Sequence, residues 1–284
     1  MKTVRAYAKI NLGLRIHGKR ADGYHEIETV LHRIDLYDEL HFESSTSLEM
    51  CSSDPAVPDG KDNLCLRATS LLRKHLNISA GARISLTKRI PIGAGLGGGR
   101  ADAGTVLREL PKFWNVSPDR DRLSVLALEL GSDVPYFLRN GTAIARGRGE
   151  LLEYFPLSLP YTVLLCYPRI QVSTAWAYSQ VKPIPKEHAS NLKDLLIDGL
   201  RNPAELSRNL KNDFESIVFD TFPQLRNIKD VMLHEGAIYA SLSGSGSSVF
   251  GLFSDLSGVR TVSRLLQSRN YEVFLSPPHF SPGD

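Results

Sequence analysis

Alternating hydrophobic and polar positions predict two strands near the start of the chain. The segments VRAYAKINLGLRI, at 4–16, and DELHFES, at 38–44, both have a period of two. The segment between them is GKRADGYHEIETV, at 18–30, and the ADG near its start is typical of a turn. We therefore expect the N-terminal part of the chain to be rich in sheet.

A helix and a further strand follow. In NLCLRATSLLRKHL, at 63–76, leucines recur at helical spacing, and either Asp62 or Asn63 is a suitable N-cap. The segment ARISLTKRI, at 82–90, alternates again and predicts a strand. A glycine-rich stretch and a helix-like stretch, RADAGTVLRELPKF at 100–113, come next.

A second well-signalled helix begins after residue 116. Ser117 is the expected N-cap, Pro118 the first helical residue and Gly131 the terminator. This helix leads directly into GSDVPYF, at 131–137.

The pattern changes near residue 155. The proline-rich LLEYFPLSLP, at 151–160, precedes YTVLLCY, at 161–167, which reads as a buried strand. The rest alternates between expected helices and strands: a helix at 222–236 closed by Gly236, a strand at 247–253, a helix at 259–268 and a strand at 271–276. We expect two domains, 1–155 and 156–284, of which the second is a compact α+β unit.

The composition of the chain argues against some classes of partner. The chain has 284 residues, 42% of them hydrophobic and 23% charged, as in ordinary soluble globular proteins. A net charge of +3 without a long Lys/Arg run argues against a nucleic-acid partner. No apolar run of 18 residues occurs and the N-terminus lacks the apolar core of a signal peptide, so we expect a cytoplasmic protein with no membrane partner.

The cysteines indicate a reducing compartment. Cys51, Cys65 and Cys166 are an odd number and include no C-x-x-C pair. This usage argues against a disulfide scaffold and against a zinc site.

The glycine-rich stretch PIGAGLGGGRADAG, at 91–104, is the strongest functional signal. Five glycines in seven positions are costly as packing, since each glycine costs roughly 0.5–1 kcal/mol relative to alanine in regular structure. They are expected where a ligand approaches the main chain. Backbone N–H groups in a tight turn, followed by the N-terminus of a helix, favour an anion. Phosphate is therefore the first hypothesis.

Three well-known phosphate loops fit this stretch poorly. The Walker A motif requires a Lys-Ser/Thr pair, which is missing here. Gly93, Gly95 and Gly98 satisfy G-x-G-x-x-G, but the nearest acidic residue at the required offset, Asp119, lies in the first turn of an expected helix rather than at a strand end. The protein-kinase loop is excluded because HRD, DFG and VAIK do not occur.

The stretch PIGAGLGGGRADA closely resembles the phosphate-binding loop of the GHMP small-molecule kinases, which include galactokinase, homoserine kinase and mevalonate kinase. Six more blocks resemble, in order, those of one kind of kinase in this family, which acts on a cytidine diphosphate-linked polyol of the non-mevalonate isoprenoid pathway. They are AKINLGL at 8–14, DGYHEIETV at 22–30, DNLCLRA at 62–68, LGSDVPYF at 130–137, VSTAWAY at 172–178 and SLSGSGSSVFGLF at 241–253.

This resemblance covers nearly the full chain and implies both a fold and an activity. The implied fold is α+β with two domains, the N-terminal one like domain 2 of ribosomal protein S5 and the C-terminal one ferredoxin-like. The implied activity is ATP-dependent phosphorylation of the 2-hydroxyl of the polyol. A homoserine- or mevalonate-type kinase and a non-catalytic ligand sensor remain as alternatives, and we expect a monomer or a weak homodimer.

The resemblance also implies a catalytic pair. Asp133 is at the position that takes the proton of the acceptor hydroxyl, and Lys9 is expected beside it, where it keeps the carboxylate ionised. The residues alone favour a turn-forming aspartate for Asp133 in GSD, just past a helix end. Lys9 favours the catalytic interpretation, because a lysine in an apolar strand pattern is costly unless it is paired.

Binding residues are implied in the same way. The resemblance assigns ATP binding to Asn63, Lys88, Pro91, Gly93, Ala94, Gly95, Leu96, Gly97, Gly98, Gly99, Arg100 and Ala101. It assigns substrate binding to Asn11, Tyr24, His25, Thr174, Tyr178, Gly244, Ser245 and Gly246.

Within the substrate site, Tyr24 and Tyr178 are expected to be aromatic plates for the pyrimidine, with His25 at its polar edge. The alternatives are that the first two side chains cover a hairpin or a helix packing surface, and that Asn63 is an ordinary helix cap. Residues 243–248, SGSGSS, are expected either to close over the active site or to form a flexible hairpin tip.

This chain departs from its relatives inside the loop. Arg100 and Ala101 stand where the family usually carries serines. Ala101 cannot ligate a metal, and we expect Arg100 to place a fixed positive charge on the ATP phosphates. We predict no metal-binding side chain. ATP is expected as its Mg²⁺ complex, with the ion held mainly by phosphate oxygens and water. Arg146 and Arg148 either add to the positive charge or form a solvated turn.

Overall fold

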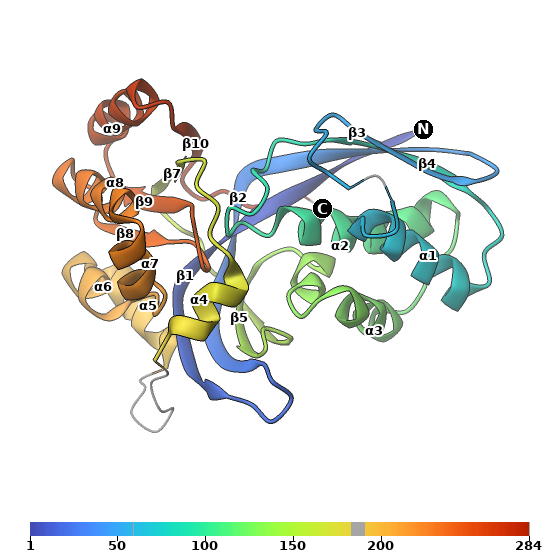
Figure 1. Ribbon diagram of the computed structural model, residues 1–284, viewed down its shortest axis with the longest axis horizontal. Helices are drawn as coiled ribbons and strands as arrows, with labels where there is room; N and C mark the ends of the chain where they lie inside the picture. The colour runs from blue at the N-terminus through green and yellow to red at the C-terminus, as the bar shows by residue number, and fades with distance from the viewer. Residues whose placement is uncertain (59, 183–190, 284) are drawn as a thin grey trace. The chain divides into compact units, whose positions relative to one another are not determined.

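The computed structural model describes residues 1–58, 60–182 and 191–283, which form two compact units (Figure 1). Unit 1 comprises Met1–Ala8, Leu36–Ile92 and Gly97–Asn140, and unit 2 comprises Lys9–Asp35, Gly93–Leu96 and Gly141–Asp284. Two long strands, β1 (Lys2–Lys19) and β2 (His25–Glu43), contribute residues to both. Because these units interleave along the chain, they leave the expected domain boundary at 155/156 a prediction.

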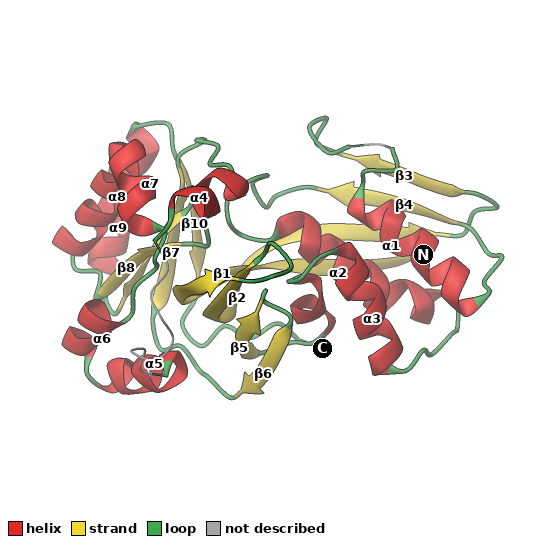
Figure 2. Ribbon diagram, turned by 60° about the horizontal axis from the view of Figure 1, so that its bottom comes forward, coloured by secondary structure: helices red, strands yellow, loops and turns green. Residues whose placement is uncertain are grey.

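Unit 1 places helices on one face of a small sheet. Strand β4 (Ala82–Thr87) pairs in parallel with β3 (Leu48–Ser52) and antiparallel with residues 39–43 of β2. Figure 2 shows the helices of this unit along one face of these strands. They are α1 (Leu64–Leu76), α2 (Gly98–Phe113), α3 (Arg120–Leu130) and the 3₁₀ helix η1 (Val134–Leu138).

One expected helix start in unit 1 is confirmed and one is wrong. Asn63 caps α1, with its side-chain oxygen accepting from the N–H of Cys65 at 2.8 Å. Helix α3 is capped by Asp119 rather than by Ser117, so Pro118 is not its first residue. The Asp119 carboxylate accepts from the N–H of Arg122 at 2.7 Å, and its negative charge is favourable at a helix N-terminus.

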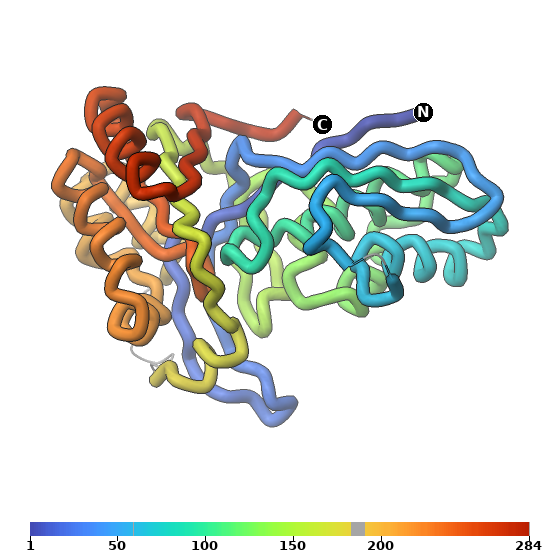
Figure 3. The backbone as a smooth tube through the Cα atoms, turned by 45° about the horizontal axis from the view of Figure 1, so that its top comes forward, coloured from blue at the N-terminus to red at the C-terminus, as the bar shows by residue number. Residues whose placement is uncertain are grey.

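Unit 2 contains the hairpin between β1 and β2, whose turn lies at the bottom of Figure 3 and is closed by the Arg20 N–H bond to the Tyr24 carbonyl at 2.7 Å. Residues 27–31 of β2 pair antiparallel with β5 (Thr142–Gly147), which pairs with β6 (Leu151–Phe155). The sequence pattern missed the first half of β2 because its alternation is interrupted by the consecutive apolar pair at 30–31.

A second, antiparallel sheet in unit 2 has the order β10-β7-β9-β8. Its strands are β7 (Thr162–Tyr167), β8 (Tyr239–Leu242), β9 (Val249–Phe253) and β10 (Glu272–Ser276). The helices are α4 (Thr174–Gln180), α5 (Leu192–Arg201), α6 (Pro203–Asn209), α7 (Glu215–Thr221), α8 (Pro223–His234) and α9 (Leu256–Ser268). This confirms the strands and helices expected after residue 160.

The core of unit 2 lies where α8 and α9 pack on this sheet. Leu225 and Met232 of α8 and Val262 of α9 are buried together with Leu164 and Val249 of the strands. Among the described residues, none of the helices has the length and apolar character needed to cross a membrane. All three cysteines are free thiols, as expected.

Candidate active site

The glycine segment is divided between the two units, and its second part begins helix α2. Gly97 is the N-cap with a left-handed backbone (φ 74°), and Gly98, Gly99 and Arg100 form the first turn. Within the described residues, no side chain caps this helix. The first N–H groups of a helix have no partner within it, so this turn is suited to bind an anion.

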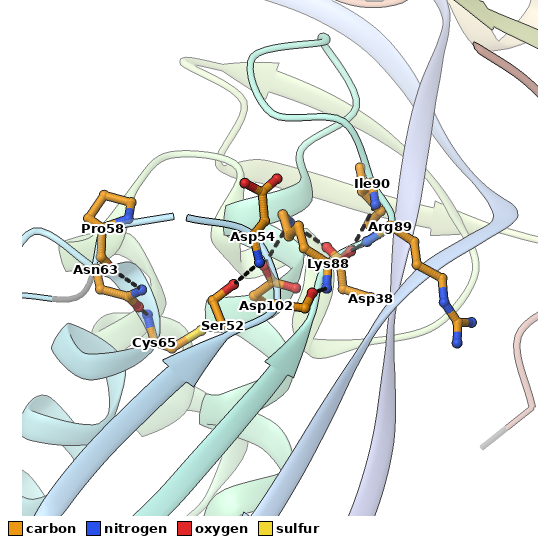
Figure 4. Close-up of polar contacts among 11 residues, drawn as sticks. Asp38, Ser52, Asp54, Pro58, Asn63, Cys65, Lys88, Arg89, Ile90 and Asp102 are labelled. Atoms are coloured by element: carbon orange, nitrogen blue, oxygen red, sulfur yellow. Dashed lines mark hydrogen bonds and ion pairs between the residues drawn. The ribbon is translucent and has the colours of Figure 1, made fainter. Parts of the chain in front are cut away.

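Figure 4 shows a buried charge cluster formed by Asp38 of β2, Lys88, which follows β4, and Asp102 of α2. The ammonium of Lys88 contacts the Asp38 carboxylate and lies 3.0 Å from Oδ2 of Asp102. The three side chains are 5%, 0% and 2% exposed. The other oxygen of Asp38 accepts from the backbone N–H groups of Arg89 and Ile90. The single positive charge of Lys88 is therefore shared between two acidic side chains in the interior of unit 1.

This cluster explains why residue 98 is glycine. A Cβ at Gly98 would lie 2.9 Å from Nζ of Lys88 and 3.0 Å from Cγ2 of Ile90. The start of α2 consequently rests on the lysine, and a larger residue would displace it. Burial and the neighbouring Asp38 raise the pKa of Asp102 to about 8, although Lys88 opposes this.

Asn63, expected near the adenine, uses its side chain as a helix cap. Its oxygen accepts from Cys65 and Leu66, and its Nδ2 donates to the carbonyl of Pro58 at 2.7 Å (Figure 4). The ordinary-cap interpretation of this residue is confirmed. A contact with ATP stays a prediction.

Arg100 and Asp133 form an ion pair in unit 1. Nε of Arg100 lies 2.6 Å from Oδ1 of Asp133, and the two side chains are 51% and 30% exposed. Asp133 precedes η1, but its side chain makes no capping hydrogen bond to the described residues. Its carboxylate is thus directed to Arg100 rather than used to form the turn.

In unit 2, Lys9 is buried at the start of a chain of hydrogen bonds. Its Nζ donates at 2.6 Å both to Oδ1 of Asn11 and to the carbonyl of Gly95. Asn11 in turn donates to Thr29, whose hydroxyl donates to the carbonyl of Gly13. These bonds fix the amide of Asn11 with its oxygen toward the lysine. The expected partner of Lys9 was Asp133, and that pairing stays a prediction.

The first part of the glycine segment, Gly93–Leu96, contacts the loop at 243–248. A Cβ at Gly95 would lie 2.1 Å from the carbonyl oxygen of Ser243, so only glycine fits there. The Ser243 hydroxyl donates to the Gly95 carbonyl at 3.0 Å, and the N–H of Ser248 donates to Ala94. The 243–248 loop is therefore packed against Gly93–Leu96 and is not a free hairpin tip, while its closure over the active site stays a prediction.

Two further residues hold this loop. Thr174, at the start of α4, lies 2.9 Å from the hydroxyl of Ser245. Asn212, which the sequence did not single out, donates to the carbonyls of Leu242 and Gly244, both at 2.8 Å. A lone asparagine in a polar stretch carries no sequence signal for such a role.

The expected cytidine-binding residues lie in unit 2 but are arranged differently from two facing plates. The rings of His25 and Tyr178 stack at 4.8 Å, and Tyr178 meets Phe214 edge-on. Tyr24 is 53% exposed, with the guanidinium carbon of Arg148 4.7 Å above its ring. Burial, and then the charge of Lys19, lower the pKa of His25. Its ring is therefore neutral at pH 7.

The structure thus brings the expected residues together in two groups. Arg100 and Asp133 are paired in unit 1, and Lys9, Asn11, Gly95 and Gly244 are neighbours in unit 2. The pairing of Lys9 with Asp133 joins different units and stays a prediction.

Arg146 is bound to Glu28 and Glu153. Among the described residues, no three His, Cys, Asp or Glu side chains are grouped to hold a metal ion.

Family models match both halves of the chain. The model for the N-terminal domain of GHMP kinases matches residues 63–141, and the model for their C-terminal domain matches residues 192–272. A kinase from Chlorobium phaeobacteroides (strain BS1), 4-diphosphocytidyl-2-C-methyl-D-erythritol kinase, is 45% identical over 98% of each chain. The chain belongs to the GHMP kinase family.

Solved structures of GHMP kinases agree with the fold. A crystal structure of 4-(cytidine 5'-diphospho)-2C-methyl-D-erythritol kinase is 34% identical, with a TM-score of 0.83 and full coverage of both chains. A crystal structure of mevalonate kinase is 17% identical, with a TM-score of 0.76 over 98% of this chain and 99% of its own. At that identity the likeness shows the fold alone. The expected α+β GHMP kinase fold is confirmed.

Proposed function

We propose that this chain transfers a phosphoryl group from ATP to the 2-hydroxyl of 4-diphosphocytidyl-2-C-methyl-D-erythritol, in the non-mevalonate route to isoprenoid precursors. The observation that carries the proposal is the similarity to kinases of that name. Eight of them are 39–45% identical over 98–99% of this chain. The catalytic class, an ATP-dependent kinase acting on an alcohol, follows from the family.

The first turn of α2 is the proposed site of the ATP phosphates. Its N–H groups are uncapped by any described side chain, and the half-exposed guanidinium of Arg100 is the cation of that turn. Ala101 is fully buried and has no oxygen, so this loop offers no side-chain ligand there for Mg²⁺. The ion would enter as part of the substrate, held by phosphate oxygens and water.

Asp133 is the proposed general base in unit 1. It is partly exposed, and its carboxylate is not used to cap η1. Phosphoryl transfer depends mainly on positioning and charge, so the base only has to accept the proton of a correctly placed hydroxyl. We propose that Lys9, held by Asn11 and Gly95, supplies the positive charge on the acceptor side.

The cytidyl group is proposed to bind in unit 2 near His25. Because the pKa of His25 is lowered by burial and then by Lys19, its neutral ring has a nitrogen that can accept a hydrogen bond. The 4-amino group of cytosine donates such a bond, whereas uracil presents a carbonyl at that position. The exposed ring of Tyr24 and the ring of Tyr178 are the proposed apolar contacts.

We propose that the two ligands of this protein, ATP and the polyol, are small molecules. We also propose that the protein works in the cytosol, where ATP is available. A monomer or weak homodimer without a nucleic-acid partner stays our expectation.

A binding experiment tests the choice of substrate class. Cytidine diphosphate at about 100 times its Kd should stabilise the protein by about 2.7 kcal/mol and raise the melting temperature. Uridine diphosphate should give a smaller shift, because a site that hydrogen-bonds the amino group rejects the analogue that lacks it. The measurement is a thermal melt with each nucleotide, with homoserine and with mevalonate.

Two results would count against this assignment. Equal protection by the cytidine and uridine nucleotides would mean that His25 does not read the base. Protection by homoserine or mevalonate, with none by cytidine diphosphate, would favour another kinase of the same fold.

A further inference from the structure

The ion pair between Arg100 and Asp133 joins the proposed ATP site to the proposed base. Arg100 lies in the first turn of α2, next to Gly98 and Gly99, where phosphate is proposed to bind. Its Nε is 2.6 Å from Oδ1 of Asp133. One side chain therefore stands between the two groups that must both act in phosphoryl transfer.

The paired state is unfavourable for catalysis by Asp133. A carboxylate oxygen engaged by a guanidinium is not available to accept a proton from a hydroxyl. The pair is nevertheless easily rearranged, since the Arg100 side chain is 51% exposed and that of Asp133 30% exposed. Ion pairs at such positions are weak. A polyphosphate at the helix N-terminus offers the guanidinium a more highly charged partner in bidentate geometry.

We propose that Arg100 is a positioning residue that changes partner when ATP binds. Without nucleotide it holds the carboxylate of Asp133, and with ATP bound it moves to the phosphates and leaves that carboxylate free for the acceptor hydroxyl. This inference rests on the proposed function, because it takes Asp133 as the base. It assigns a role to the arginine that directly follows the glycines of the loop.

The exchange has a thermodynamic consequence that can be measured without turnover. Coupling between two interactions is reciprocal, so an ion pair that must break on ATP binding weakens that binding. Removing the charge of Asp133 releases Arg100 in advance. ATP should then bind more tightly, and the gain should depend on the presence of Arg100.

The experiment is a double-mutant cycle on Mg-ATP affinity. Titration calorimetry compares the wild type, Arg100→Ala, Asp133→Asn and the double variant, without acceptor. We expect Asp133→Asn to tighten ATP binding by about two- to five-fold more in the Arg100 background than in the Ala background, the range typical of exposed ion pairs. The excess should shrink at high salt. Asp121→Asn, which removes an exposed carboxylate of α3, should show no such excess.

The cycle also separates this exchange from simpler roles. General repulsion between Asp133 and the phosphates would give the same gain in both backgrounds and would overturn the proposal. A purely structural link between α2 and η1 would lower the melting temperature of Arg100→Ala without any background-dependent gain, which would overturn it as well. Arg100→Lys keeps the charge and should retain part of the excess, whereas Arg100→Ser should lose it. Failure of the wild type to bind ATP at all would instead contradict the proposed function.

Discussion

The side-chain contacts of Asp133 distinguish a turn-forming aspartate from one that can act in catalysis. An aspartate after a helix end is commonly a turn former. Here the carboxylate makes no cap hydrogen bond to the described residues and lies against Arg100 instead. The carboxylate is 30% exposed and is not used by its own turn, so it becomes available for chemistry once Arg100 releases it.

Replacing Asp133 by Asn tests this role at the level of the residue. The amide keeps the shape but removes the basic oxygen, so kcat should fall by about 10²–10⁴. Both ligands should still bind, and the melting temperature should hold or rise. Steady-state kinetics and a thermal melt measure both. Turnover within about threefold of the wild type, well below the loss expected of a general base, would show that Asp133 is not the base.

The buried cluster of Asp38, Lys88 and Asp102 could not be predicted from the sequence. The resemblance to GHMP kinases assigned Lys88 to ATP binding, as a residue of the strand that leads to the nucleotide. Its two carboxylate partners lie 50 and 14 positions away. Local sequence patterns do not indicate pairing over such separations, so the two carboxylate partners were not predicted, and the contact of Lys88 with ATP stays a prediction.

At the level of the elements, local rules worked where one signal dominated. Helix α1 starts after Asn63, and Gly131 ends α3 by donating its N–H to Ala127, as expected. The predicted start of α3 was wrong because two suitable N-cap residues, Ser117 and Asp119, lie two positions apart. In the structure Asp119 is the cap. Strands β5 and β6 were missed because their pairing with β2 and with each other, not a strong alternation, defines them.

Strand β2 carries a buried histidine that makes stability depend on pH. Nδ1 of His32 lies 2.7 Å from the Thr142 hydroxyl of β5. Burial lowers the pKa of His32 from 6.5 to about 4. The folded state therefore binds this proton less readily than the unfolded state, so the stability is fully present above about pH 6.5 and is lost as pH falls toward about 4.

The expected loss over this window is on the order of 3 kcal/mol, at about 1.4 kcal/mol per pKa unit. Urea unfolding at several pH values measures it. His32→Gln, which removes the titration but keeps a polar partner for Thr142, should flatten the acid side of the curve. His234→Gln, at an exposed position in α8, serves as the control and should leave the slope intact. An unchanged slope in His32→Gln would show that another group causes the loss.

At the level of the molecule, the family and the fold could be predicted because many short blocks occur in register over the whole chain. The residue groups of the site could be predicted only in part. Within unit 2, the contact of Gly95 with Ser243 spans 148 positions, and nothing in either segment alone predicts it. A ligand was the expected reason for glycine at 95, and the structure adds a second reason, the close approach of the Ser243 carbonyl. The contact of Gly95 with ATP stays a prediction.

The most direct test of the account is the product formed with each candidate acceptor. The purified protein is given Mg-ATP with 4-diphosphocytidyl-2-C-methyl-D-erythritol, homoserine or mevalonate, and ADP and the ³¹P spectrum are followed. We predict a kcat/KM for the cytidyl substrate at least about 10³-fold above the others, since polar contacts to a substrate give such discrimination. The product should add one phosphomonoester signal without coupling to a carbinol proton, because the 2-carbon is tertiary. ADP formation only with homoserine or mevalonate, or ATP binding without acceptor-dependent turnover, would contradict the account.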